Sequence, residues 1–195
     1  MANSQNVLAG LAGFNGTPDL IHVADVATGL VLPTDAISAP AVAFKSMGYI
    51  TTNGLTDAIQ TTANDIDAYG VTAPVRTLIT TEIEEFTLAG EETNQISLAL
   101  YNRLTIASLA TAGPDGSYAV TRGPARDVHY ALVVSVQDGL NRIRWVAPNV
   151  TLINRANRVV QKGTNIEWGF TLRANLDSNG VSVYEYYNLQ SQGAS

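Results

Sequence analysis

Apolar and polar residues alternate along the second half of the chain, in the pattern typical of strands that bury one face. Residues 129–136 and 141–146 flank Gln137-Asp138-Gly139, a spacing that predicts a β-hairpin. Asn179-Gly180 predicts a turn into a further strand over 181–187. Within residues 164–174 every second side chain is expected to face the interior: Ile166, Trp168, Phe170 and Leu172.

The first half contains two more strand candidates. Residues 20–24 predict a short strand, and residues 75–88 are rich in β-branched side chains. In the second segment Thr80, Glu82 and Glu84 share one face, but the alternation changes phase at Glu84-Glu85, which predicts a β-bulge there. Asn53-Gly54 predicts a tight reversal of the chain.

One segment has the period of an α-helix instead. Apolar residues recur at intervals of three and four, which predicts a helix over 94–104 with one buried face. Thr93 is the expected N-cap. The buried face comprises Ile96, Ala99, Leu100 and Leu104.

These elements predict a mainly β fold, a β-sandwich or barrel of antiparallel strands with one flanking α-helix at about 94–104. Residues 1–20 are small, polar and glycine-rich and are expected to form an N-terminal arm, followed by a single β domain over 21–195. Residues 56–73 have neither a helical stripe nor clear strand alternation. We therefore expect a contact-making long loop over about 50–74.

Composition and charge narrow the possible functions. The chain has 195 residues, of which only 14% are charged, and its net charge is −6 with 11 basic and 17 acidic residues. Such a balance argues against a nucleic-acid-binding protein, and no apolar run is long enough to predict a membrane span. Nor do the first residues, Met-Ala-Asn-Ser-Gln-Asn, predict a secretory signal.

The charge is divided unevenly along the chain. Residues 1–100 hold two basic and eleven acidic residues, a net charge of −9, whereas residues 101–195 hold nine and six, a net charge of +3. Either the two halves interleave in one fold and the asymmetry cancels, or they form complementary surfaces that meet between copies.

The sequence offers little chemistry for catalysis. It has no cysteine and two widely separated histidines, His22 and His129, so we expect neither a metal site nor a cofactor. Glu82, Glu84 and Glu85 share one strand and suit a solvated face better than the separate environments that a carboxylate pair needs. We therefore expect no enzymatic activity.

Four arginines are candidates for contacts between subunits. Arg142 and Arg144 share a strand face, and Arg155 and Arg158 follow closely. They are either ordinary surface arginines, a seam that pairs with carboxylates of a neighbour, or a phosphate-binding patch. The natural partners across a subunit boundary would be the acidic residues of the predicted loop, Asp57, Asp65 and Asp67.

A set of segments in fixed order carries a family resemblance. It begins with Leu32-Pro33-Thr34-Asp35-Ala36 and the stretch 43–56, continues after a variable loop with Val75-Arg76-Thr77 and the Glu-Thr-Asn at 92–94, and ends with the strand 181–187. In its second segment, Met47-Gly48-Tyr49 and Asn53-Gly54 stand where the pattern commonly has Leu-Gly-Tyr and Asp-Gly. From about Ala24 to Asn188 the chain resembles the major tail protein of long-tailed, non-contractile bacteriophages (siphophages), the tail tube subunit.

This resemblance implies a virion protein that is assembled in the host cytoplasm. Its copies would form hexameric rings stacked head to tail into a hollow tube, through which DNA passes into the host without specific binding. The other implied partners are the tail terminator, tape measure and distal tail proteins, and no membrane is involved. Thr80, Glu82 and Glu84 would face the lumen, since neutral or negative residues let DNA slide.

Two other functions remain open. The chain could be another phage assembly module, such as a capsid decoration or head-completion protein. It could also be a carbohydrate-binding β-sandwich that uses Trp145, Trp168 and the tyrosines at 184, 186 and 187 as stacking platforms.

Overall fold

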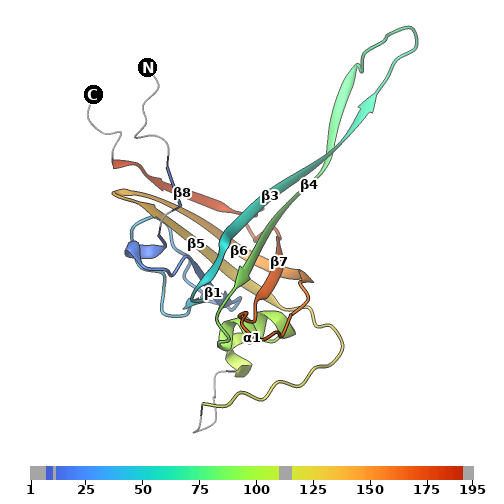
Figure 1. Cartoon of the computed structure of the whole chain (residues 1–195). Helices are drawn as coiled ribbons and strands as arrows, with labels where there is room; N and C mark the ends of the chain where they lie inside the picture. Colours follow the sequence, from blue (N-terminus) through green and yellow to red (C-terminus); the bar gives the residue numbers. More distant parts are fainter. Residues whose placement is uncertain (1–7, 11, 110–115, 191–195) are drawn as a thin grey trace.

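The computed structural model describes residues 8–10, 12–109 and 116–190 (Figure 1). Over these residues the fold is mainly β, as predicted: eight strands form one antiparallel sheet, with a single flanking α-helix. The strands follow one another as β2-β1-β5-β6-β7-β4-β3, and β8 pairs with β6. The elements are β1 (Ile21–Asp25), β2 (Lys45–Ser46), β3 (Ile50–Ile66), β4 (Arg76–Gly90), α1 (Gln95–Asn102), β5 (His129–Asp138), β6 (Asn141–Arg155), β7 (Trp168–Ala174) and β8 (Tyr184–Asn188), with short 3-10 turns at Phe14–Gly16 and Ile106–Leu109.

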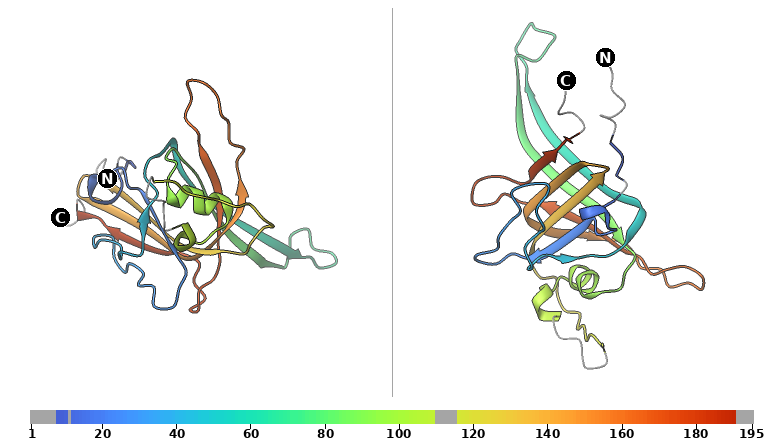
Figure 2. Two further views of the ribbon diagram at one scale, coloured as in Figure 1. Left: turned by 90° about the horizontal axis from the view of Figure 1, so that it is seen from below. Right: turned by 90° about the vertical axis from the view of Figure 1, so that its left-hand side faces the viewer.

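The sheet curls because β6 changes partner along its length. One edge of β6 pairs with β5, while the other pairs with β8 over residues 142–146 and with β7 over residues 150–155. α1 covers one open end of the curled sheet (Figure 2). The main core forms between the strands and this helix, with Phe86, Tyr130 and Leu100 among its fully buried side chains.

The helix is shorter than predicted and begins one residue later. Asn94, not Thr93, is the N-cap: its side chain accepts hydrogen bonds from the backbone N–H groups of Ile96 and Ser97, each at 3.0 Å. Thr93 is occupied elsewhere, because its hydroxyl accepts the indole N–H of Trp168 at 3.0 Å. Ile96, Ala99 and Leu100 are buried as predicted, and Leu104 is partly buried against the core.

The segment 50–74 is not a loop, contrary to our prediction. Residues 50–66 form β3, which pairs with β4 in a long antiparallel hairpin. Asn53-Gly54 does not reverse the chain but lies inside β3, where the register shifts between Ile50 and Leu55. Gly54 has a φ of 70° at this irregularity, a conformation that glycine adopts without strain.

The predicted bulge is also displaced. The register between β3 and β4 is regular at Glu84-Glu85 and shifts instead between Thr81 and Ile79, so that Thr80 is the extra residue. The hydroxyl of Thr80 donates a hydrogen bond to the carbonyl of Thr62 at 3.1 Å. Because no bulge intervenes, Glu82 and Glu84 keep the phase of the buried residue Phe86.

The remaining strand predictions are confirmed, but β6 runs on to Arg155, past the predicted end at 146, and β8 begins at Tyr184 rather than at 181. The hairpin across Gln137-Asp138-Gly139 forms β5 and β6. In β7 Trp168, Phe170 and Leu172 are buried, but Ile166 precedes the strand and is 36% exposed. The described part of the N-terminal segment lies along β5, since the amide of Ala12 donates to the carbonyl of Gln137 at 3.3 Å.

Candidate assembly interface

The β3–β4 hairpin extends well beyond the rest of the sheet (Figure 1). β7 pairs with β4 over residues 85–90, so that no strand among the described residues lies on the second edge of residues 76–84 of β4. Along its whole length β3 pairs with β4 alone, because it is the last strand of the sheet. Both strands of the projecting part therefore present unpaired backbone N–H and C=O groups to any strand that approaches.

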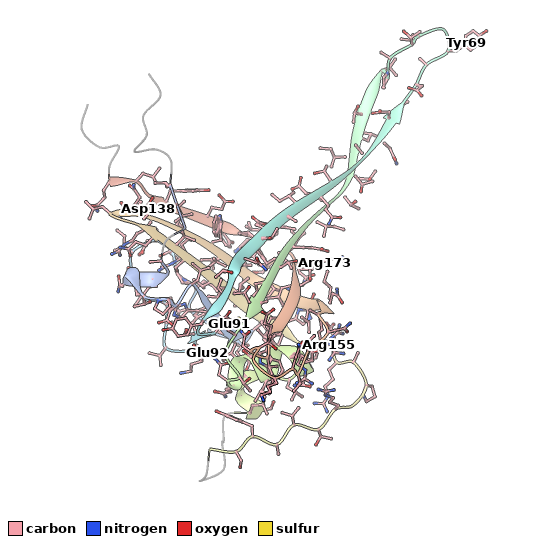
Figure 3. The ribbon with its side chains drawn as sticks, viewed as in Figure 1. Tyr69, Glu91, Glu92, Asp138, Arg155 and Arg173 are labelled. Atoms are coloured by element: carbon pink, nitrogen blue, oxygen red, sulfur yellow. The ribbon has the colours of Figure 1, made fainter. Side chains whose placement is uncertain are left out.

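Apolar side chains are exposed along this projecting part. Ile59 is 61% exposed, Ile79 69% and Val75 58%, and Tyr69 at the far end is fully exposed (Figure 3). A two-stranded hairpin that buries no apolar face is at best marginally stable alone in water. In the isolated chain the apolar side chains of this hairpin are therefore left exposed to solvent.

The cross-strand register gives the hairpin two chemically different faces. Asp57 lies opposite the buried Phe86, Ile59 opposite Glu84, and Thr61 opposite Glu82. Directly opposed residues point to the same side, so these three acidic side chains share the face that continues into the core. The hydroxyl of Thr61 donates to Glu82 at 3.4 Å on this side.

Like charges gather on this face. Burial, followed by repulsion from Glu185 on β8, raises the pKa of Asp57. Burial likewise raises the pKa of Glu84, opposed by a 3.0 Å hydrogen bond from Ser182 and reinforced by repulsion from Asp57, Glu185 and Glu82. We call Asp57, Glu82, Glu84 and Glu185 the acidic face. No basic side chain forms an ion pair with any of its members within the described part of the chain.

The opposite face of the hairpin is nearly neutral. Its cross-strand pairs include Thr56 with Thr87 and Thr62 with Thr81. Its one acidic residue, Glu85, accepts hydrogen bonds from the guanidinium of Arg173 at 2.8 and 3.1 Å. Near the domain this face therefore offers hydroxyl groups, and toward the tip it carries Arg76, which lies opposite Ile66.

Arg144 is not available for contacts between subunits, contrary to our prediction. It is fully buried, and its guanidinium donates to the carbonyls of Asp35 and Ser38, both at 2.8 Å, and to the hydroxyl of Ser135 at 3.1 Å. Burial lowers the pKa of Arg144, while the neighbouring carboxylate of Asp35 opposes that shift. These hydrogen bonds of Arg144 hold residues 35–38 against the sheet. Arg142, on the same strand, is half-buried and donates to the carbonyl of Ile37 at 3.5 Å.

Arg155 and Arg158 lie on the surface near the C-terminal end of α1. The guanidinium of Arg155 donates to the carbonyl of Tyr101 at 2.8 Å, and that of Arg158 lies 4.7 Å from the ring centres of both Tyr101 and Trp168. The acidic residues Asp57, Asp65 and Asp67 lie on the hairpin, away from this helix, so the predicted pairing does not occur within one chain. A pairing between chains stays a prediction.

Sequence reasoning missed three further arginines in the same region, Arg103, Arg122 and Arg126. Arg122 donates to the side chain of Asn102 at 3.3 Å, and Arg103 and Arg126 line one cavity of about 230 Å³. The available signal was the excess of basic residues after residue 100, but nothing in the local pattern places these arginines around one helix end.

The assignment of Thr80, Glu82 and Glu84 to the lumen stays a prediction. In the structure these three residues do not share one face of the hairpin. Glu82 and Glu84 belong to the acidic face, on the same side of the sheet as the core. Thr80 sits at the bulge instead. We call the opposite face of the hairpin, with Thr56, Thr62, Thr81 and Thr87, the threonine-rich face. A channel lined by the outer side of this sheet would be lined by the threonine-rich face and not by the two glutamates.

The structure gives little support to the other chemistries considered. Trp168 is 2% exposed and makes an edge-on contact with Tyr101, Trp145 is partly buried against the core, and Tyr184 and Tyr186 pack against a second apolar cluster. Tyr187 is 55% exposed, but the other four rings do not join it in an open platform for sugars. His129 lies 2.7 Å from the side chain of Asn149, and no three potential metal ligands come together in the described residues. In the same part of the chain no helix is long and apolar enough to cross a membrane.

Comparison with known proteins gives distant structural likenesses and no sequence relative. No family model matches this chain, and neither does any curated protein. Among solved structures that match, a chain in the cryo-EM structure of the anti-feeding prophage (AFP) baseplate, 6-fold symmetrised, has 8% identity over 85% of this chain and 89% of that chain, with a TM-score of 0.43. A likeness this distant carries no argument about what the present chain does.

Proposed function

We propose that this chain is a structural subunit of a phage tail tube, in which hexameric rings stack into a conduit for DNA. The observation that supports the proposal is the projecting β3–β4 hairpin, whose strand edges are open and whose apolar side chains are exposed. The ordered family resemblance of the sequence supplies the identity of the assembly. No catalytic step is part of the proposal.

Edge pairing between copies is the proposed route of assembly. An exposed strand edge as long as β3 invites pairing with another chain, and proteins that stay monomeric normally block such edges with charges, prolines or covering segments. If the hairpin of one copy joins the sheet of the next around a ring, the edges disappear and the exposed apolar residues are covered. Head-to-tail contacts between unlike surfaces then allow the assembly to grow without limit.

The threonine-rich face of the hairpin is the proposed wall of the channel. It lies on the outer side of the sheet, and its only acidic side chain, Glu85, is neutralised by Arg173. Apart from Arg76 near the tip and the paired Arg173, this wall offers hydroxyl groups to phosphates, so DNA would pass without being held tightly. This proposal replaces Glu82 and Glu84 as lumen residues and keeps Thr80 as a candidate.

A shortened hairpin tests the proposal. Residues 63–80 can be removed and Thr62 joined to Thr81, its cross-strand partner, through an Asn-Gly turn. We expect the wild type to form rods with a hollow centre in negative-stain images and the shortened variant to remain soluble, folded and unassembled. Circular dichroism and thermal melting of the variant check that the β domain survives the excision.

Two results would count against the proposal. Rods that grow equally well from the shortened variant would show that the hairpin is not the assembly element. Closed oligomers of the wild type that never elongate, even with tail initiation proteins present, would favour a capsid decoration or head-completion protein instead.

A further inference from the structure

Five arginines surround the C-terminal end of α1. They are Arg103, Arg122, Arg126, Arg155 and Arg158, which we call the arginine patch, and they account for five of the chain's 11 basic residues. They come from the helix end, from the segment that follows it and from the end of β6 and beyond, and Figure 3 shows Arg155 on this side of the molecule. The fold therefore concentrates basic residues that are scattered over 56 positions of sequence.

Two members of the arginine patch are held in place by aromatic rings. The guanidinium of Arg155 lies 5.3 Å from the ring centre of Tyr101, and that of Arg158 lies 4.7 Å from the rings of Tyr101 and Trp168. Both arginine residues are nevertheless exposed to solvent. Such stacking orients a guanidinium while leaving donors free for an anionic partner.

Arg103 occupies a position that normally favours glycine. It ends α1 with φ 53° and ψ 52°, a left-handed conformation that is uncommon for residues other than glycine, asparagine and aspartate. Its Nε atom is buried and has no hydrogen-bond partner among the described residues. The buried Nε cannot meet a second copy, so Arg103 contributes to the patch through the positive charge of its half-buried side chain.

A helix end alone does not require this much positive charge. One or two basic side chains suffice to balance the partial charge at the C-terminus of a short helix. None of the five arginines forms an ion pair with a carboxylate in the described residues. One carboxylate, that of Asp127, lines the same cavity as Arg103 and Arg126, and the five arginines still leave an excess of positive charge on an otherwise acidic protein.

The acidic face supplies the missing counterpart at the other end of the molecule. Figures 1 and 2 place α1 at one end of the β domain and the projecting hairpin at the opposite end. Asp57, Glu82 and Glu185 are exposed, and Glu84 is half-buried beside them. Neither surface can reach the other within one chain, but a second copy arranged head to tail brings them together.

We propose that the arginine patch of one copy docks onto the acidic face of a second copy. This inference rests on the proposed function, because it requires copies to associate head to tail. Guanidinium groups pair with carboxylates in a bidentate fashion, which fixes direction as well as affinity. The charge complementarity would thus set the order of copies along the assembly, while the hairpin edges supply backbone pairing.

A second copy fits the arginine patch better than a nucleic acid does. The chain contains only two lysines, Lys45 and Lys162, and both lie outside the patch. The aromatic rings beneath the arginines, Tyr101 and Trp168, are buried and cannot stack with bases. A net charge of −6 would also repel a nucleic acid from most of the surface.

Complementary charge reversals test the pairing. One variant carries Arg122→Glu and Arg126→Glu, and the other carries Glu82→Arg and Glu185→Arg; all four side chains are exposed in the wild type. We expect each variant alone to need about a hundredfold higher concentration to assemble, because like charges then face each other. An equimolar mixture should assemble at the wild-type concentration, since each reversed surface meets a complementary one.

A matched control carries Lys45→Glu and Lys162→Glu, which change the net charge as much as the first variant does. It should assemble like the wild type. Thermal melting of all variants checks folding, and light scattering with negative-stain imaging measures assembly.

The proposal is overturned if wild-type rods form and either reversal variant assembles normally, or if the mixture fails to recover. It is also overturned if a single-stranded oligonucleotide binds the wild type, loses affinity for the Arg122/Arg126 variant and leaves assembly unaffected. Absence of rods from the wild type would instead reject the proposed function on which this pairing rests.

Discussion

Glu84 carries a negative charge that the folded chain disfavours. Burial and the neighbouring carboxylates raise its pKa above the unfolded value of 4.5, so the native state binds protons more readily than the unfolded state. Stability therefore falls as the pH rises through 4.5 and on through the higher native pKa. Glu84→Gln removes the charge and keeps an oxygen that can accept the hydrogen bond from Ser182.

We expect Glu84→Gln to be more stable than the wild type at pH 7 by less than about 1 kcal/mol, because the group is partly screened by solvent. The advantage should shrink as the pH falls toward 4. Thermal midpoints of both proteins from pH 4 to pH 8 measure the difference. Glu91→Gln, which changes a glutamate outside the acidic face, serves as the control, and an equal pH profile for both variants would argue against repulsion at Glu84.

Single residues also show what local sequence could and could not predict. An N-cap at the start of α1 was predictable, but the choice of Asn94 over Thr93 depends on Trp168, which is 75 positions from Thr93 and claims its hydroxyl. Arg144 is a stronger case. Strand alternation cannot indicate that a charged side chain is buried, because the carbonyls that satisfy it come from residues 35 and 38, more than 100 positions away.

At the scale of elements, the strands that bury one face were predictable and β3 was not. Periodic alternation arises only where burial selects apolar residues on one side. Residues 56–66 bury neither face, so Thr, Asn, Gln, Ala and Asp occupy both, and the segment has the composition of a loop. The displaced bulge has a related cause: Phe86 is the first buried residue of β4, so the glutamates before it were free to share its phase.

Hydrogen exchange should distinguish the two parts of the hairpin. Amides of residues 59–80 are expected to exchange much faster than those of β5 and β6, because no apolar contact or third strand stabilises the distal part. In assembled rods the same amides should become protected while those of the core change little. Equal protection of residues 59–80 in dilute and assembled protein would contradict the proposed role of the hairpin.

At the scale of the whole molecule, the antiparallel fold could be predicted from the sequence, but the surfaces of the proposed assembly could not. Antiparallel architecture follows from turn spacing and alternation, which are local. The charge difference between residues 1–100 and 101–195 indicates that acidic and basic residues are separated, but it does not predict the acidic face or the arginine patch. In the fold, Glu185 of β8 lies near Asp57 of the hairpin, and Arg155 at the end of β6 contacts α1. Acidic residues therefore gather at one end of the molecule and basic residues at the other, which gives the molecule a charge polarity.

This polarity makes thermal stability dependent on concentration. A contact formed only by folded chains stabilises the native state by mass action, so the thermal midpoint of the wild type should rise by several degrees over a hundredfold range of concentration. The variant that carries Arg122→Glu and Arg126→Glu retains the core but loses the complementary charge, and its midpoint should stay constant over the same range. Differential scanning fluorimetry across the dilution series measures both. If the two proteins shift equally, the stabilising contact does not use the arginine patch; if neither shifts, the open edges of β3 and β4 are tolerated by a monomer.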